Sequence, residues 1–173
     1  MEKAVVFVDV QNIYYTVKQQ FTCHFNYRIF LEKVSRNRQL LKSFAYATDK
    51  GDQKQAGFQN ILVNIGFDVK LIPFIQRKDG SAKGDWDVGI ALDMLEYAKK
   101  ADTIILASGD GDFASVIKKI IAEDKVAVEV YGVKELTAFA LIKAATRYYP
   151  IEDNMLLPIP KKHQINNPPI NNN

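Results

Sequence analysis

Apolar residues along the chain follow two kinds of pattern, short continuous runs and longer stretches with helical spacing. The runs over residues 4–8 and 103–107 are almost free of polar side chains and rich in β-branched ones. Such runs are typical of strands buried on both faces of a parallel sheet. Weaker strand patterns cover residues 43–47, 67–75 and 126–131. The chain therefore contains at least two strong candidates for central strands.

Helical spacing of apolar residues fills the intervals between these strands. In one interval, Ile90, Met94 and Tyr97 recur three or four residues apart, which is the spacing of one helix face. Strands that alternate with helices predict an α/β fold in which right-handed crossovers join parallel strands. The predicted helices cover residues 12–20, 28–37, 52–64, 86–99, 112–123 and 135–146.

Length and C-terminal composition predict the domain organisation. A chain of 173 residues is long enough for one domain with a core of its own. Four of the six prolines and three consecutive asparagines lie close to the C-terminus. Such a composition buries too little apolar surface to offset the entropy of ordering. We predict one domain over residues 1–153 and a flexible, Pro/Asn-rich tail over residues 154–173.

Composition also excludes several classes of protein. A single cysteine, Cys23, excludes a disulfide framework and a multi-cysteine zinc site. No apolar run approaches the roughly 18 residues that a membrane span needs. The first ten residues lack the apolar region and the cleavage site of a signal peptide. We therefore expect a soluble, cytoplasmic protein with no membrane partner.

The net charge of +3 conceals an uneven distribution. Residues 1–78 carry a net charge of +6, whereas residues 79–112 carry −5. A small total charge does not by itself indicate a polyanionic partner. A basic first half followed by an acid-dense centre is a stronger indication of one.

The candidate chemistry lies where the predicted strands end. Asp9 closes the first buried strand, and Asp110 and Asp112 follow the second. Asp85 and Asp87 stand at the start of the helix that leads into that second strand. Ligands of open parallel sheets bind beyond the carboxyl ends of the strands, so these acids converge if the two strands are neighbours. Clustered carboxylates repel one another, and Mg²⁺ or Mn²⁺ relieves that repulsion.

Some of these acids have purely structural interpretations. Asp112 precedes a helix and is a good N-cap. Asp85 and Asp87 at a helix start interact favourably with the helix dipole. Asp9 has no such explanation, because an acid gains nothing from burial at the end of an apolar strand. Asp110 is surplus to capping if Asp112 is the cap. Together the acids favour a metal site.

Four further residues have a structural and a functional interpretation. Asn12 either caps the first helix or contacts a phosphate or a carboxylate at the same edge. Asp93 either faces solvent or supports the acids. Ser108 either favours a turn or donates a hydrogen bond to a neighbouring aspartate. Lys83, beside a glycine, either binds phosphate or is solvated. The sequence leaves each pair of interpretations open.

Three motifs in order along the chain resemble a known family. They are FVDVQN (residues 7–12), KGDWDV (residues 83–88) with LDML (residues 92–95), and SGDGDF (residues 108–113). They are similar to the motifs of the LabA-like group of NYN domains, within the PIN-like nuclease superfamily. The resemblance extends from about residue 3 to residue 149. It implies a three-layer α/β/α sandwich around a mainly parallel sheet, with Rossmann-like topology.

The resemblance also implies the roles of individual residues. The family's acidic positions, which bind Mg²⁺ or Mn²⁺, match Asp9, Asp87, Asp110 and Asp112. Asn12, Asp93 and Ser108 match supporting positions. Two departures concern the motifs themselves. The family commonly has serine where this chain has Gly111, and both Asp85 and Asp87 compete for one acidic position, with the helix register favouring Asp87.

The function that these observations predict is metal-dependent hydrolysis of RNA, with single-stranded RNA as the substrate. Divalent ions on the four carboxylates would activate water, so the mechanism needs no histidine. Asn12 would position the scissile phosphate, and basic residues would guide the backbone toward the acids. The basic candidates are Lys50, Lys54, Arg77, Lys78 and Lys83.

Two other classes of function remain possible from the sequence. One is a non-catalytic RNA-binding or regulatory module that retains the acidic pocket. The other is a phosphohydrolase of the haloacid dehalogenase type, which also places an aspartate after its first strand. That chemistry requires a second aspartate two residues later, and this chain has Gln11 there. The sequence therefore favours the ribonuclease.

Overall fold

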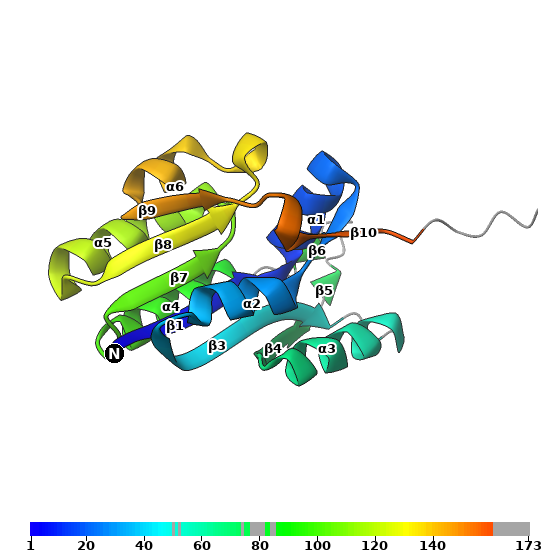
Figure 1. Ribbon diagram of the computed structural model, residues 1–173, viewed down its shortest axis with the longest axis horizontal. Helices are drawn as coiled ribbons and strands as arrows, with labels where there is room; N and C mark the ends of the chain where they lie inside the picture. The colour runs from blue at the N-terminus through cyan, green and yellow to red at the C-terminus, as the bar shows by residue number, and fades with distance from the viewer. Residues whose placement is uncertain (50, 52, 74, 77–81, 84–85, 161–173) are drawn as a thin grey trace, which may run out of the picture.

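A parallel sheet forms the centre of the molecule in the computed structural model, which describes residues 1–49, 51, 53–73, 75–76, 82–83 and 86–160 (Figure 1). Among these residues, six strands pair in the order β4-β3-β1-β7-β8-β9, and each neighbouring pair is parallel. The order reverses direction between β1 and β7, as in doubly wound folds. The strands are β1 (Glu2–Asp9), β3 (Arg38–Asp49), β4 (Asp68–Pro73), β7 (Thr103–Ala107), β8 (Ala127–Gly132) and β9 (Arg147–Pro150).

Helices cover both faces of this sheet and make a three-layer sandwich, which confirms the predicted fold class (Figure 1). The first three helices share one hydrophobic core with the sheet, and the last three share a second core on its other face. β1 and β7 contribute alternate side chains to both cores, which explains their continuous apolar runs. The helices are α1 (Val10–Phe21), α2 (Tyr27–Ser35), α3 (Gln53–Ile65), α4 (Asp87–Ala98), α5 (Ala114–Asp124) and α6 (Phe139–Ala144).

Polar side chains and glycine set several helix ends. The Asn26 side chain accepts a hydrogen bond from the Ile29 N–H at 3.1 Å and caps α2. α3 ends at Ile65, close to the predicted end at residue 64, and is followed by Gly66, whose φ of 126° few other residues adopt. Among the described residues, no helix has both the length and the apolar character that crossing a membrane requires.

Several short elements differ from the sequence-based prediction. The helix predicted over residues 135–146 is a 3₁₀ turn, η2 (Lys134–Leu136), followed by the shorter α6. The predicted loop over residues 76–84 includes a two-stranded pairing. The short elements are β2 (Cys23–Phe25), β5 (Ile75–Gln76), β6 (Ala82–Lys83), η1 (Gly111–Phe113), η3 (Asp153–Met155) and β10 (Leu156–Pro158).

The start of the predicted C-terminal tail needs correction. Residues 154–158 are ordered, because η3 and then β10 follow the domain and β10 pairs antiparallel with β2. Met155 is buried and packs in the core that α1 and α2 share. One buried methionine and three strand residues anchor this segment, although prolines surround it. Residues 161–173 of the predicted tail lie outside the described residues.

A polar network crosses the amino ends of five strands. Glu129 on β8 is 2% exposed and accepts hydrogen bonds from Arg38 at 2.6 Å and from Arg147 at 3.3 Å. Arg38 also donates to Glu2 at 2.9 Å, and Thr103 donates to the same carboxylate. These bonds hold the pKa of Glu2 below its ordinary value, Thr103 contributing most. The network thus joins β3, β1, β7, β8 and β9 at the edge away from the candidate site.

We expect replacement of Glu129 by glutamine to destabilise the protein by about 2 kcal/mol, because Arg38 would lose the shorter of its two ion pairs and keep only Glu2 as a charged partner. The free energy of unfolding in urea measures this change. Glu123→Gln is the matched control, since Glu123 pairs with Lys119 in an exposed position, and it should change stability by less than about 0.5 kcal/mol. Equal effects of the two variants would contradict a structural role for the network.

Candidate functional site

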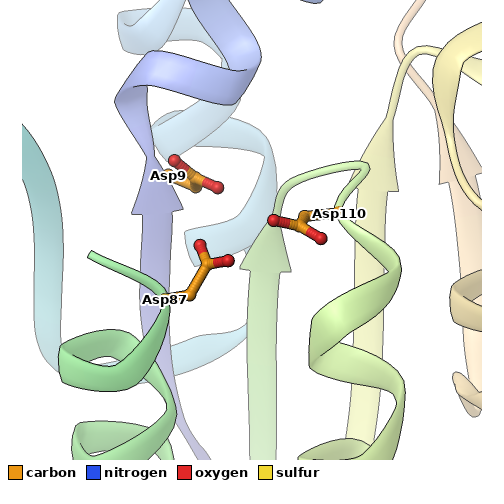
Figure 2. A group of neighbouring side chains, drawn as sticks. All are labelled: Asp9, Asp87 and Asp110. Atoms are coloured by element: carbon orange, nitrogen blue, oxygen red, sulfur yellow. The ribbon is translucent and has the colours of Figure 1, made fainter. Parts of the chain in front are cut away.

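Three carboxylates meet at the edge of the sheet where the strand order reverses. Figure 2 shows Asp9 at the end of β1, Asp110 in the turn after β7 and Asp87 at the start of α4, with their carboxylates facing one another. One oxygen of each lies within 4.8 Å of the others. Asp9 is buried, and Asp87 and Asp110 are half-buried. The pairing of β1 with β7 brings two of the acids together, as the sequence analysis expected.

Hydrogen bonds fix Asp9 at the junction of β1 and α1. Asp9 is the last residue of the strand and the N-cap of the helix, and it accepts from the Asn12 N–H at 3.3 Å. The Ser108 hydroxyl donates to its other oxygen at 3.0 Å. The negative charge of Asp9 also acts on Tyr27, whose pKa is raised mainly by burial and further by that charge. Asp9 is thus held by one donor from the first turn of α1 and one from the turn after β7.

A tight turn after β7 positions Asp110. Ser108 is fully buried and accepts from the Asp110 N–H at 3.2 Å while it donates to Asp9. The Asn12 side-chain oxygen accepts from the Gly109 N–H at 2.8 Å and ties the start of α1 to the same turn. Both open interpretations of Ser108 therefore hold, since it shapes the turn and contacts an aspartate.

Trp86 positions Asp87 at the start of α4. The Trp86 ring N–H donates to the Ala47 carbonyl at 2.9 Å, and the ring packs edge-on against Tyr46 at 5.3 Å. A Cβ on Gly89 would approach the Trp86 ring to 2.5 Å, so only glycine fits beneath it. Asp87 lies in the first turn of α4, where the helix dipole stabilises its charge.

Asp110 is the cap that the sequence pattern attributed to Asp112. The Asp110 carboxylate caps η1 by accepting from the Asp112 N–H at 2.9 Å. Asp112 is exposed within η1, and α5 begins after Phe113 with no side-chain cap. Asp112 is not in the group of three facing carboxylates. Its role as a fourth ligand stays a prediction.

Asp93 is not in the group of three facing carboxylates and belongs to a second polar group. It accepts hydrogen bonds from the Tyr46 hydroxyl at 2.7 Å and from the Lys70 ammonium at 2.6 Å. Burial and, to a smaller extent, the bond to Asp93 raise the pKa of Tyr46. Asp93 therefore braces β3 and β4 against α4. Its role in supporting the acids stays a prediction.

The predicted basic residues fall mostly outside the described residues. Lys50, Arg77 and Lys78 lie outside the described residues, as does the acidic candidate Asp85. Lys83 is described only as a backbone position in β6. Lys54 is exposed in the first turn of α3. Its role in binding a phosphate backbone stays a prediction.

Beside Asp9 lies a pocket that no sequence pattern predicted. A cavity of about 330 Å³ lies between α1, α3 and the end of β3. The glutamines that line it carried no signal in the sequence, because isolated glutamines on helices are ordinary surface residues. The lining residues are Val10, Gln11, Tyr14, Tyr15, Ala47, Thr48, Lys54, Gln55, Phe58 and Gln59.

Comparison with known proteins identifies the family. Residues 3–152 match the model of the NYN domain. The chain belongs to the NYN domain family. Low amplitude and bright protein LabA of Synechococcus elongatus is 28% identical over 159 residues, which cover 87% of this chain and 84% of LabA. A crystal structure of a protein of unknown function from Vibrio parahaemolyticus is 45% identical, with a TM-score of 0.86, and covers 90% of this chain and 96% of its own.

The donor set of this NYN domain fits a hard divalent cation. The three facing side chains offer carboxylate oxygens, the ligands that Mg²⁺ and Mn²⁺ prefer. Three negative charges this close repel one another, and a cation among them would remove that repulsion. The N-termini of α1 and α4 and the Ser108 hydroxyl offset part of it.

We expect Ser108→Ala to destabilise the domain by about 2 kcal/mol, since it removes a donor to the buried Asp9 carboxylate and leaves the half-buried Asp110 N–H without its acceptor. Urea unfolding measures the loss. Ser35→Ala is the control, because that hydroxyl donates to the Glu32 carbonyl in an exposed position, and it should stay within about 0.5 kcal/mol of the parent. A neutral Ser108→Ala would show that this hydroxyl does not hold the acids.

Gly111, where the family commonly has serine, generates a further prediction. A Cβ at this position would lie 2.9 Å from the Ala138 Cβ. We expect Gly111→Ala to cost about 1–3 kcal/mol through overpacking, measured by urea unfolding. The double variant Gly111→Ala/Ala138→Gly should recover most of that loss. Failure of the second substitution to restore stability would place the cost elsewhere.

Proposed function

We propose that this NYN domain is a metal-dependent ribonuclease that hydrolyses phosphodiester bonds of single-stranded RNA. The observation that carries the proposal is the meeting of Asp9, Asp87 and Asp110 at the reversal of strand order. That position is where open α/β sheets bind their ligands. Membership of the NYN family, which the sequence relates to PIN-like nucleases, supports the same chemistry.

In this proposal the three aspartates, joined by Asp112, hold Mg²⁺ or Mn²⁺. The ion would supply a water nucleophile at neutral pH and a Lewis acid for the departing oxygen. Asp9 has the most fixed position, because the Asn12 N–H and the Ser108 hydroxyl each bind one of its oxygens. Preorganised ligands need no rearrangement when substrate arrives.

Asn12 and Lys54 are the described residues that we assign to the substrate. The Asn12 side-chain oxygen is engaged by the Gly109 N–H, so its amide nitrogen is the group that would donate to a phosphate. Lys54 is exposed at the start of α3 and would contribute a positive charge on the approach to the acids. Lys50, Arg77, Lys78 and Lys83 complete the proposed basic set.

We expect Asp9→Asn and Asp110→Asn each to reduce Mn²⁺-dependent cleavage of single-stranded RNA by at least about 100-fold, since even the outer partners of metal ligands are worth up to that factor. Gel analysis of labelled RNA measures cleavage, and circular dichroism checks the fold. Asp68→Asn is the control, because Asp68 is exposed at the opposite edge of the sheet. It should cleave like the parent protein.

Three other results would reject the proposal. Full activity of both site variants would show that the carboxylates do not carry the chemistry. Activity that persists after removal of divalent ions with a chelator would show that no metal is involved. Binding of RNA without cleavage in Mg²⁺ and in Mn²⁺, across substrates of varied sequence, would identify a non-catalytic RNA-binding module.

A further inference from the structure

The pocket and the acidic site are formed by neighbouring residues of β1, α1 and β3. Val10, which lines the pocket, follows Asp9 directly. On the neighbouring strand β3, Tyr46 pairs with Asp9, so Ala47 lies one residue further toward the carboxyl end of the sheet. Ala47 lines the pocket, while its carbonyl accepts the hydrogen bond from Trp86 beside Asp87. The pocket and the acids therefore lie at the same edge of the sheet, on the two sides of β1.

The aromatic wall of the pocket is exposed and held in place. Tyr14 is 38% exposed and Tyr15 is 53% exposed, and their rings meet edge-on at 5.3 Å. The Tyr14 ring also stacks with His24 at 6.1 Å and lies beneath the Lys18 ammonium at 5.6 Å. Large exposed rings that are held by their neighbours are typical platforms for stacking a nucleic-acid base.

The remaining walls supply the polar groups that a nucleotide requires. Gln11 and Gln59 carry amides that both donate and accept, as the edge of a base does. Lys54 adds a positive charge for a phosphate. These groups stand on α1 and α3, whose first turns lie at the sheet edge that carries Asp9.

The size of the pocket limits what it can hold. A volume of about 330 Å³ lies near the lower end of small-molecule pockets, roughly 300–1,000 Å³. It therefore admits one nucleotide unit and excludes a duplex. A larger cavity of about 760 Å³ shares Tyr14, Lys54 and Phe58 with it, so the groove continues away from the acids.

We infer that this pocket binds one unpaired base of the RNA, at a fixed distance along the strand from the phosphate at the acidic site. This inference rests on the proposed function, which supplies RNA as the ligand. A base within a duplex is paired and stacked, so it cannot enter the pocket. The pocket would thus give the preference for single-stranded RNA that the acids alone cannot give.

The test measures RNA binding in the Asp110→Asn background, so that cleavage does not consume the probe. The probes are short, labelled single-stranded RNAs that are identical except for one abasic nucleotide at successive positions. Fluorescence anisotropy in Mn²⁺ should show that the abasic substitution weakens binding roughly tenfold at one position and little at the others.

Variants assign that position to the pocket. Tyr14→Ala should weaken binding of the intact RNA roughly tenfold and remove the sensitivity to the abasic position. Tyr14→Phe keeps the ring and should behave like the parent. Tyr15→Ala, at a more exposed position, repeats the test if Tyr14→Ala unfolds. Lys54→Ala should weaken all the RNAs alike, whereas Lys99→Ala, at the far end of α4, should not.

The outcomes separate this inference from the proposed function. If the parent protein cleaves RNA but no abasic position weakens binding, the inferred base-binding pocket is wrong and the proposed ribonuclease function stands. Position-dependent binding without cleavage keeps the pocket and overturns the ribonuclease. Absence of RNA binding overturns the pocket, as does equal sensitivity of Tyr14→Ala and the parent to the abasic position. Binding of a free nucleoside monophosphate as tight as that of the RNA would assign the pocket to a small nucleotide instead.

Discussion

The pairing of β1 with β7 is the constraint on which the site depends. Because the strand order reverses there, the described helices that follow β1 and β7 pack on opposite faces of the sheet. Asp9 and the turn at Ser108 come together at this edge as a consequence of register, since Val8 pairs with Ala107. α4, which returns to the centre of the sheet to begin β7, must start at the same edge and brings Asp87 with it.

A cluster of carboxylates destabilises a fold unless its surroundings compensate, and here the compensation is built from the backbone. Asp9 and Asp110 are both caps, so each accepts from a backbone N–H that would otherwise lack a partner. The bonds from Ser108 to Asp9 and from Gly109 to Asn12 connect the start of α1 with the turn after β7. The acids are therefore part of the local structure as well as candidate ligands, and a substitution at Asp9 changes both. This coupling is the reason that stability and activity must be measured on the same variants.

The sequence predicted the central part of the fold and the acidic cluster because both follow from strong local patterns. Strands buried on both faces read as continuous apolar runs, and acids that end such runs are conspicuous. The pairing of β2 with β10 was missed, since a three-residue strand has no measurable period. The capping roles of Asp110 and Asp112 were reversed because both residues suit a cap and only the 3₁₀ turn decides between them. The bond between Arg38 and Glu129 joins residues 91 positions apart, and local pattern carries no information about it.

The carboxyl end of β1 has different neighbours on the two faces of the sheet. On the α4 side, Trp86 packs closely against Gly89 and Tyr46 and positions the helix that carries Asp87, so this side presents the acids. On the α1 and α3 side, the helices diverge enough to leave a pocket lined by exposed rings and amides. Ala47 contacts both sides. Its carbonyl accepts from Trp86 on the α4 side, and its side chain packs in the core on the α1 and α3 side. A strand of RNA lying across the end of β1 would meet the acids on one side and the pocket on the other. The position of the phosphate at the acids would then depend on the base in the pocket as well as on the charges, because the end of β1, paired with β3 and β7, sets the distance between the acids and the pocket.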